Sequence, residues 1–108
     1  MVTARLSPLE KIVLTTFATR VRERFGPRTV AIDLFGSRAR GEGRADSDLD
    51  VLVLVLGLTS AERREIQDLA FDLSLDNALV ISPLVVDSAR WDLSLPLARS
   101  ISHDRLTL

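Results

Sequence analysis

The sequence predicts an α+β fold, in which a small mixed β-sheet has helices packed against one of its faces. The first observation is the order of the apolar patterns, which along the chain reads helix, strand, loop, strand, helix, strand, helix. The second is that the segment between the first two strands contains too little helix for a parallel crossover, so these strands are expected to pair antiparallel. With 108 residues, the chain has the length of one domain, which we place at residues 1–108.

The first helix is expected to begin after Ser7 and to end before Gly26 and Pro27. Ser7 has the character of an N-cap, Pro8 suits the first helical position, and Glu10 completes a capping box. Between these limits, apolar residues recur at the spacing of a helix face. They are Leu9, Ile12, Val13, Phe17, Val21 and Phe25.

Two strands and a polar loop are expected next. Residues 29–35 alternate in a strand pattern, within which Asp33 is expected to face outward. Residues 36–47 are rich in glycine, serine, arginine and acidic side chains, which indicates a loop with one helical turn. Residues 48–56 contain a continuous aliphatic run and form the second strand.

The second helix begins after Thr59, which forms another capping box with Glu62. A third strand is expected at residues 78–86, and its Pro83 suits an edge position because proline cannot donate to a sheet. From Asp87 onward we expect one or two short helical segments that pack back onto the sheet. The apolar face of the second helix consists of Ile66, Leu69, Ala70 and Leu73.

Composition limits the classes of partner. The 14 basic and 15 acidic residues leave a net charge of −1, so no overall positive field favours nucleic acid or a membrane surface. There is no cysteine and only one histidine, His103, which we expect at the surface rather than in a zinc site. No apolar stretch approaches the roughly 20 residues of a membrane span, and no signal peptide precedes the first helix. We therefore expect a cytoplasmic protein without a nucleic-acid or membrane partner.

Two aspartates, Asp48 and Asp50, stand at the head of the apolar run that forms the second strand. Alternate residues of a strand point to one face about 6.6 Å apart, so these carboxylates are expected to converge on one point. Like charges this close raise each other's pKa unless a cation lies between them. Mg²⁺ suits the position because it binds carboxylate oxygens and keeps open positions for substrate phosphates. We therefore predict that Asp48 and Asp50 are metal ligands.

A phosphate-binding turn is expected at Gly36 and Ser37, directly after the first strand. Glycine lets the backbone approach a ligand, serine adds a hydroxyl donor, and the N–H groups of such a turn form an anion site. Of the arginines in the same loop, Arg38 is the candidate for a direct contact with the nucleotide, and a solvated loop position is the alternative. A phosphate cradle beside metal carboxylates is what phosphoryl or nucleotidyl transfer requires.

The arrangement of Gly36 and Ser37, ten intervening residues, and then Asp48 and Asp50 before a run of aliphatic residues resembles a known signature. It is similar to that of the nucleotidyltransferase superfamily that includes DNA polymerase beta, and the length resembles its smallest branch, the minimal nucleotidyltransferases (MNT). The resemblance is close over residues 29–56 and loose elsewhere. It implies a polymerase beta-like fold, a grip of Gly36 and Ser37 on the nucleotide phosphates, and a metal-binding and catalytic role for the two aspartates.

The resemblance also implies a function. Many proteins of this branch are encoded beside a HEPN toxin and act as its antitoxin, some by transferring AMP from ATP to the toxin. We therefore expect a nucleotidyltransferase that uses Mg²⁺ and ATP and modifies a hydroxyl group on a HEPN-type toxin. Two alternatives stay open: a non-catalytic antitoxin that acts by binding alone, and a nucleotidyltransferase with a small-molecule acceptor. Assembly with itself or with a partner chain is open as well.

The third carboxylate of that superfamily has no clear counterpart here. The resemblance places it at Ser82, on the third predicted strand, whereas Asp87 lies at the far end of the same strand. Positions 82 and 87 differ by an odd number, so they face opposite ways in a regular strand. A bulge at Pro83 would correct the parity. Asp87 is therefore a tentative third ligand.

Overall fold

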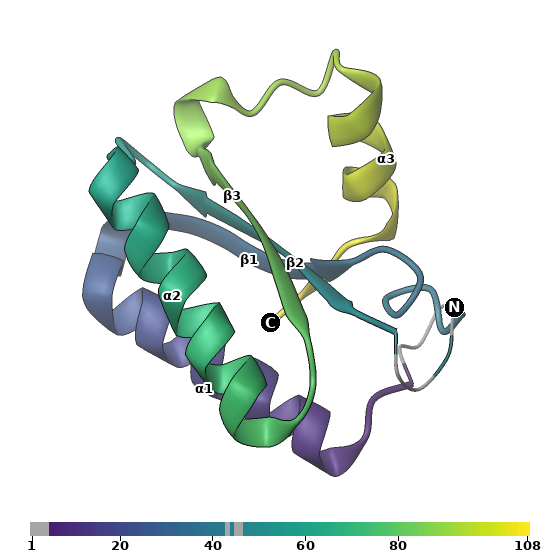
Figure 1. Cartoon of the computed structure of the whole chain (residues 1–108). Coiled ribbons are helices and arrows are strands. Elements are labelled where there is room, and N and C mark those ends of the chain that lie inside the picture. Colours follow the sequence, from purple (N-terminus) through teal and green to yellow (C-terminus); the bar gives the residue numbers. More distant parts are fainter. Residues whose placement is uncertain (1–4, 43, 45–46) are drawn as a thin grey trace.

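The computed structural model describes residues 5–42, 44 and 47–108, and these residues have the predicted α+β class (Figure 1). Single 3₁₀ turns follow the first helix and the third strand, at Gly26–Arg28 and Ser88–Arg90. The helices are α1 (Pro8–Phe25), α2 (Ser60–Asn77) and α3 (Pro96–Asp104), and the strands are β1 (Thr29–Phe35), β2 (Leu49–Val55), β3 (Ile81–Asp87) and β4 (Leu106–Thr107).

The four strands form one mixed sheet in the order β3-β2-β1-β4. β1 pairs antiparallel with β2 and with β4, which confirms the predicted antiparallel pairing of the first two long strands. β2 and β3 are parallel, and α2 provides the crossover between them. Pro83 lies on the edge strand, as predicted, so its missing N–H removes no hydrogen bond from the sheet interior.

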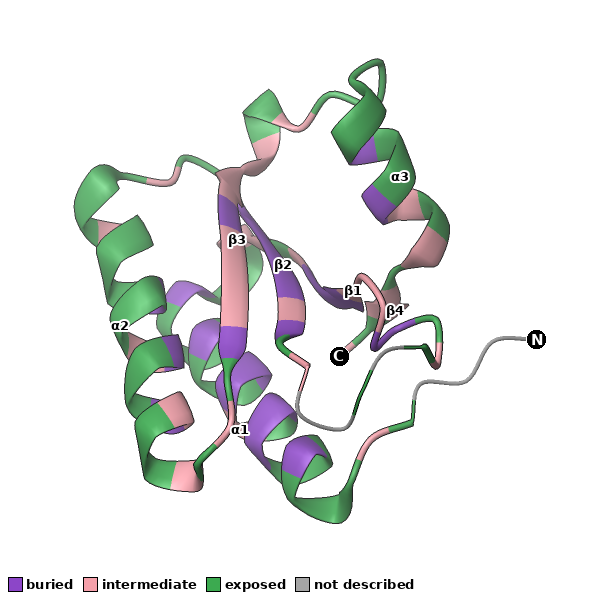
Figure 2. Ribbon diagram, turned by 45° about the vertical axis from the view of Figure 1, so that its right-hand side comes forward, coloured by how far each residue is buried: buried purple, intermediate pink, exposed green. Residues whose placement is uncertain are grey.

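One face of the sheet is covered by α1 and α2, and the main core lies there (Figure 2). The odd-numbered residues of β2 point into this core because side chains alternate along a strand. They meet apolar residues of both helices, including Phe17, which is fully buried. The predicted face of α2 is confirmed: Ile66, Ala70 and Leu73 are buried, and Leu69 packs beside them.

The opposite face of the sheet is not bare, and in this respect the expectation of helices on one face was wrong. Ile101 of α3 packs against Leu52 and Leu54 of β2 in a second, smaller cluster, which Trp91 borders. The tail pattern was too short to show which face it would cover. The even-numbered residues of β2 therefore share their face with α3, and this is also the face that Asp50 occupies.

Both predicted capping boxes are present. The N–H of Glu10 donates to Ser7 Oγ at 3.0 Å, and the N–H of Glu62 donates to Thr59 Oγ1 at 3.1 Å. Ala78 ends α2 in a left-handed conformation with a φ of 52°. β3 therefore begins at Ile81 rather than at residue 78, where the third strand was expected to begin.

Asp33 was expected to face outward, and this was wrong. Its exposed fraction is only 3%, and its carboxylate pairs with Arg105, with 3.4 Å between Oδ2 and Nη1. β4 lies alongside β1 at this position, since Asp33 is in register with Thr107. The final strand therefore covers a residue that would otherwise reach solvent. Within the described part of the chain, no helix has both the length and the apolar character to cross a membrane.

Candidate functional site

The two aspartates lie where β2 begins, on the face of the sheet opposite α1 and α2. Asp48 immediately precedes the strand and is exposed, and Asp50 is half-buried within it. Asp50 is in register with Phe35 of β1 and with Ser82 of β3, so it lies between two neighbouring strands. The predicted convergence is visible in the electrostatics, because the charge of Asp48 acts on Asp50.

The pKa of Asp50 is raised above its ordinary value. The main cause is burial, which penalises the charged carboxylate, and repulsion from Asp48 adds to it. An incoming cation relieves both effects because it restores favourable contacts to the charged oxygens. The two carboxylates therefore form a local negative site in need of a positive partner.

Gly36 lies directly against the Asp50 carboxylate. A methyl group built at Gly36 would collide with Asp50 Oδ2 and would lie 3.3 Å from Asp50 Cγ. The φ of Gly36 is +77°, a conformation that side chains other than glycine rarely adopt. Steric space and backbone conformation thus both require glycine here. The predicted phosphate turn and the predicted metal carboxylate are adjacent in space.

The turn that follows Gly36 is compact, as the predicted helical turn implied. The N–H of Ala39 donates to Gly36 O at 3.1 Å, and the N–H of Glu42 donates to Ser37 O at 2.9 Å. Ala39 is fully buried and fastens the middle of the turn to the core. Ser37, which directly follows Gly36 at the start of the turn, is half-exposed.

Arg38 has a different setting from the one its sequence position suggested. Its exposed fraction is 4%, and its Nη2 donates to Glu10 Oε1 and Oε2 at 2.7 and 2.8 Å. The same guanidinium donates to the carbonyl oxygens of Ser47 and Arg5, each at 3.1 Å. A direct contact with a nucleotide would require this buried pair to break. We therefore correct the assignment of Arg38 from a nucleotide ligand to a residue that holds the loop from inside.

A second ion pair fastens the same loop from its other side. Arg40 Nη1 lies 2.9 Å from Asp104 Oδ2, at the end of α3. This pair is partly exposed, so it contributes little to stability, but it fixes where the loop meets α3. Sequence reasoning missed both ion pairs because partners 28 and 64 residues apart leave no periodic signal.

Ser82 occupies the place that the resemblance assigns to a third carboxylate. It is in register with Asp50, and its hydroxyl donates to Asp48 Oδ2 at 3.3 Å. The tentative assignment of Asp87 as third ligand is wrong. Asp87 is paired with Val55 at the other end of β3, about 16 Å along the strand, and the register between the strands contains no bulge. The carboxylate of Asp87 instead accepts a hydrogen bond from the N–H of Gly57 at 3.1 Å.

The donor set fits a hard divalent cation held partly by its substrate. Among residues 5–42, 44 and 47–108, no group of three histidine, cysteine, aspartate or glutamate side chains is placed to hold a metal. A pair of carboxylates of which one, Asp48, is exposed is nevertheless a suitable ligand set for Mg²⁺ when phosphate oxygens and water complete its coordination shell. Burial and the charge of Asp48 together raise the pKa of Asp50, and a bound cation would favour its ionised form.

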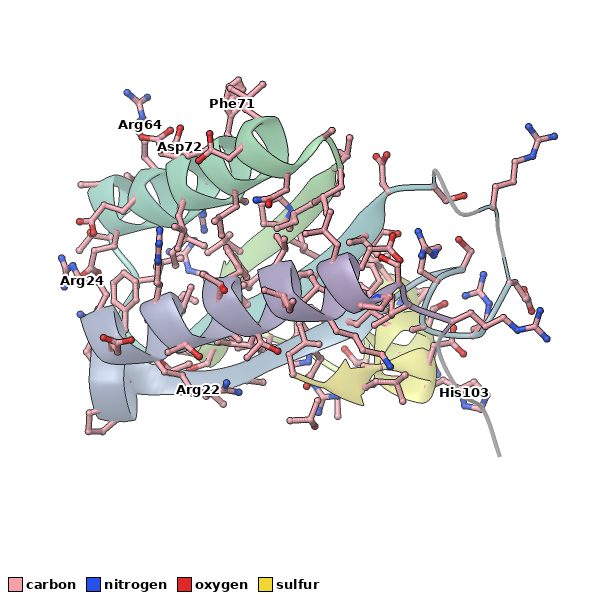
Figure 3. All side chains as sticks on the ribbon, turned by 90° about the horizontal axis from the view of Figure 1, so that it is seen from below. Arg22, Arg24, Arg64, Phe71, Asp72 and His103 are labelled. Carbon is pink, nitrogen blue, oxygen red and sulfur yellow. The ribbon has the colours of Figure 1, made fainter. Side chains whose placement is uncertain are left out.

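His103 lies near the end of α3, next to Asp104. It is exposed on α3 and projects from the side of the molecule (Figure 3), in agreement with the expectation of a surface residue. The same view shows Phe71 and Asp72 on the outer side of α2, away from the sheet.

Solved structures with the same arrangement of elements are known. A toxin–antitoxin structure with AMP-PNP matches 85% of this chain and 69% of its own, with 22% identity and a TM-score of 0.56. The complex of a tri-AMPylated Shewanella oneidensis HEPN toxin with an MNT antitoxin matches 90% and 69%, with 19% identity and a TM-score of 0.54. A putative minimal nucleotidyltransferase matches 88% of this chain and 95% of its own, with 27% identity and a TM-score of 0.52. The first two show the likeness of fold alone.

A search of curated proteins gives no match. The sequence model of the nucleotidyltransferase domain matches residues 14–104, which include every element from the middle of α1 to the end of α3. That span contains the Gly36 turn and both aspartates. The resemblance drawn from those few residues is thereby confirmed, and the chain belongs to the nucleotidyltransferase domain family.

Proposed function

We propose that this chain transfers AMP from ATP, with Mg²⁺, to a hydroxyl side chain of a HEPN-type toxin, and thereby acts as its antitoxin. The observation that carries the proposal is the contact between Gly36 and the Asp50 carboxylate. It joins a turn suited to phosphate and a pair of carboxylates suited to a metal in one small site. These are the two parts that nucleotidyl transfer needs, because its catalysis depends on positioning and on charge stabilisation.

Each residue of the site has a role in this proposal. Asp48 and Asp50 would hold Mg²⁺, which would supply positive charge to the triphosphate. Gly36 and Ser37 receive the phosphates, since the backbone of Gly36 can approach closely and Ser37 adds its hydroxyl. Ser82 orients Asp48 through its hydrogen bond.

The chemical step is a substitution at the α-phosphorus of ATP. The acceptor oxygen forms a new bond to that phosphorus, the bond from phosphorus to the bridging oxygen breaks, and pyrophosphate leaves. The acceptor proton passes to a carboxylate of the pair.

The choice of acceptor rests on the similar structures. One holds an AMPylated HEPN toxin beside an MNT antitoxin, which is the product and the partner that this proposal requires. Another was obtained with AMP-PNP, an analogue of the proposed donor.

The test is incubation of the purified chain with the protein of a neighbouring HEPN-type gene, Mg²⁺ and ATP labelled at the α-phosphate. We expect label on the partner, and loss of that label with Asp48→Asn or Asp50→Asn. Asp72→Asn is the matched control, since Asp72 is an exposed aspartate on the outer side of α2 (Figure 3). Wild-type protein that forms the complex without labelling its partner would refute the transfer.

Ser82 favours one second candidate, a non-catalytic antitoxin. A serine at the third ligand position leaves two carboxylates to hold metal, and a site that has lost activity is expected to lose such a ligand. In that case the complex forms with the same affinity in wild-type protein and in Asp48→Asn, and neither labels the partner.

A further inference from the structure

We propose that Arg38 and Glu10 form a buried clamp that positions the two halves of the nucleotide site relative to each other. The halves are the turn at Gly36 and Ser37, which follows β1, and the aspartates at the start of β2. The effect of the clamp on catalysis rests on the proposed nucleotidyl transfer, whereas the clamp itself is a property of the folded chain alone.

The clamp lies where three distant segments meet at one end of the sheet (Figure 1). Arg38 follows Ser37 in the turn, so its backbone moves with the phosphate site. Its guanidinium donates to Ser47 O, which belongs to the residue directly before Asp48. It also donates to both oxygens of Glu10, in the first turn of α1. One side chain therefore links the turn to the start of β2 and anchors both to a helix.

Contacts within α1 hold Glu10 in place independently of Arg38. Its Oε1 accepts the N–H of Ser7 at 2.8 Å, and its own N–H donates to Ser7 Oγ, so the capping box of α1 holds the carboxylate in one orientation. Burial alone would raise the pKa of Glu10, but the hydrogen bonds from Arg38 and from Ser7 outweigh burial and lower it. Glu10 is consequently ionised at neutral pH and offers a rigid anionic anchor.

The geometry requires arginine rather than lysine. The groups that Arg38 binds lie in different directions: a carboxylate from α1 and the carbonyl oxygens of Ser47 and Arg5. A planar guanidinium presents five N–H donors in a fixed fork and can reach all three. Arg38 Nη2 donates to Glu10 and to Arg5 O, whereas Nη1 donates to Ser47 O, so a lysine ammonium that keeps the pair with Glu10 loses the Ser47 carbonyl. Arg38→Lys thus separates the charge pair from the link to β2.

The test compares Arg38→Lys and the double variant Arg38→Met/Glu10→Gln with the wild-type chain. The double variant removes both charges of the Arg38–Glu10 pair, so its melting temperature is expected to recover most of what Arg38→Met alone loses. The link to Ser47 is absent in both. We therefore expect the amide NMR signals of Gly36, Ser37, Asp48 and Asp50 to shift in both, and kcat of transfer to fall about tenfold to hundredfold.

Arg24→Met/Glu65→Gln is the matched control. It removes an exposed ion pair with 2.9 Å between Arg24 Nε and Glu65 Oε2, distant from the turn, and it should leave the four amide signals and kcat unchanged. If the double variant at Arg38 and Glu10 regains stability and also shows wild-type amide signals and kcat, the pair has a structural role only and the clamp is overturned. Absence of transfer by the wild-type protein would refute the proposed function, while the amide signals of the chain alone would still decide the clamp.

Discussion

At the scale of single residues, the backbone of Gly36 lies so close to the Asp50 carboxylate that any side chain at position 36 would collide with it. The carboxylate is half-buried and its pKa is raised, so its ionised form is disfavoured in the absence of a cation. Gly36 lies against this carboxylate and has a positive φ, of +77°. Each residue type is explained by the other, because the missing side chain of Gly36 makes room for the acid.

Gly36→Ala tests this contact. The added methyl group would displace the Asp50 carboxylate, and alanine would be strained at the φ of +77° by about 1 kcal/mol or more. We expect at least a tenfold loss of nucleotide transfer, measured with labelled ATP. Gly26→Ala is the control: Gly26 also has a positive φ, of +53°, but a methyl group there meets nothing within 4 Å. Equal activity losses in the two variants would attribute the effect to strain instead of to Asp50.

Asp50→Asn is expected to stabilise the metal-free chain at neutral pH. The folded-state pKa of Asp50 lies above its unfolded value, so ionised Asp50 lowers the free energy of unfolding at pH values above the folded pKa. That cost disappears below the unfolded value, about 3.9, where the carboxyl is protonated in both states. Urea unfolding in the presence of a chelator should therefore show a more stable variant at pH 7 and no difference near pH 3. A variant less stable than wild type at pH 7 would contradict this account.

At the scale of elements, β3 decides which residue completes the site. Its parallel register with β2 places Ser82 beside Asp50 and sends Asp87 to the opposite end. The loop after β1 is held by α1 through Glu10 and by α3 through Asp104. The site is thus built where the three strands β1, β2 and β3 and the ends of two helices meet, although it contains few residues.

Ser82→Asp should convert the site to three carboxylates. We expect Mn²⁺ to bind about tenfold more tightly by calorimetry, because another anionic oxygen faces the cation. Without metal, the variant should have a lower melting temperature than wild type, since three carboxylates repel one another. Ser88→Asp, beyond the other end of β3, adds the same charge away from the site and should leave Mn²⁺ affinity unchanged. Unchanged affinity in Ser82→Asp would show that position 82 does not face the metal.

The N-cap of α2 supports the crossover that sets the register of β3. Thr59 Oγ1 accepts the N–H of Glu62, and Thr59→Ala removes this bond from the helix end. We expect a loss of about 1 kcal/mol in the free energy of unfolding, measured by urea denaturation. Thr19→Ala, at an exposed position within α1, is the control and should be neutral or slightly stabilising because alanine favours helices. A neutral Thr59→Ala would mean that packing alone fixes the start of α2.

At the scale of the whole molecule, one face of the sheet carries the main core and the other carries the candidate site. α1 and α2 bury the main core on one face, so most of the stabilising apolar burial occurs away from the chemistry. The other face carries the acid pair, with α3 and the small cluster around Leu52 beside it. Substitutions at the acid pair can therefore alter ligand binding without loss of the core.

Mg²⁺ and ATP together should stabilise the folded chain as a whole. A ligand that binds only the folded state adds about 2.7 kcal/mol at a concentration 100 times its Kd. For a domain of this size, that corresponds to a rise on the order of 10 °C in Tm. Asp50→Asn should abolish most of the rise, and Asp72→Asn should retain it. A wild-type Tm that does not respond to Mg²⁺ and ATP, with or without the partner protein, would contradict the nucleotide site.

Much of the fold could be predicted from the sequence because its signals are local. Helical periodicity, two capping boxes and the proline on the edge strand each depend on a few neighbouring residues, and all are present in the structure. The adjacency of the Gly36 turn to the two aspartates also follows from short range. An antiparallel pair of strands joined by one loop must bring the end of the first beside the start of the second.

The sequence by itself thus determined the first two helices, the three long strands, the pairing of β1 with β2, the family, and the residues at which metal and phosphate are expected to bind; it did not show β4. Only the tertiary structure decided that Arg38 turns inward to Glu10, that Asp33 is buried against Arg105, and that α3 covers the second face. The reason is physical. Whether a charged side chain remains in solvent or pairs with a distant partner depends on the balance between its desolvation cost and the ion pair that packing makes available. Neighbouring residues in the sequence do not reveal that balance.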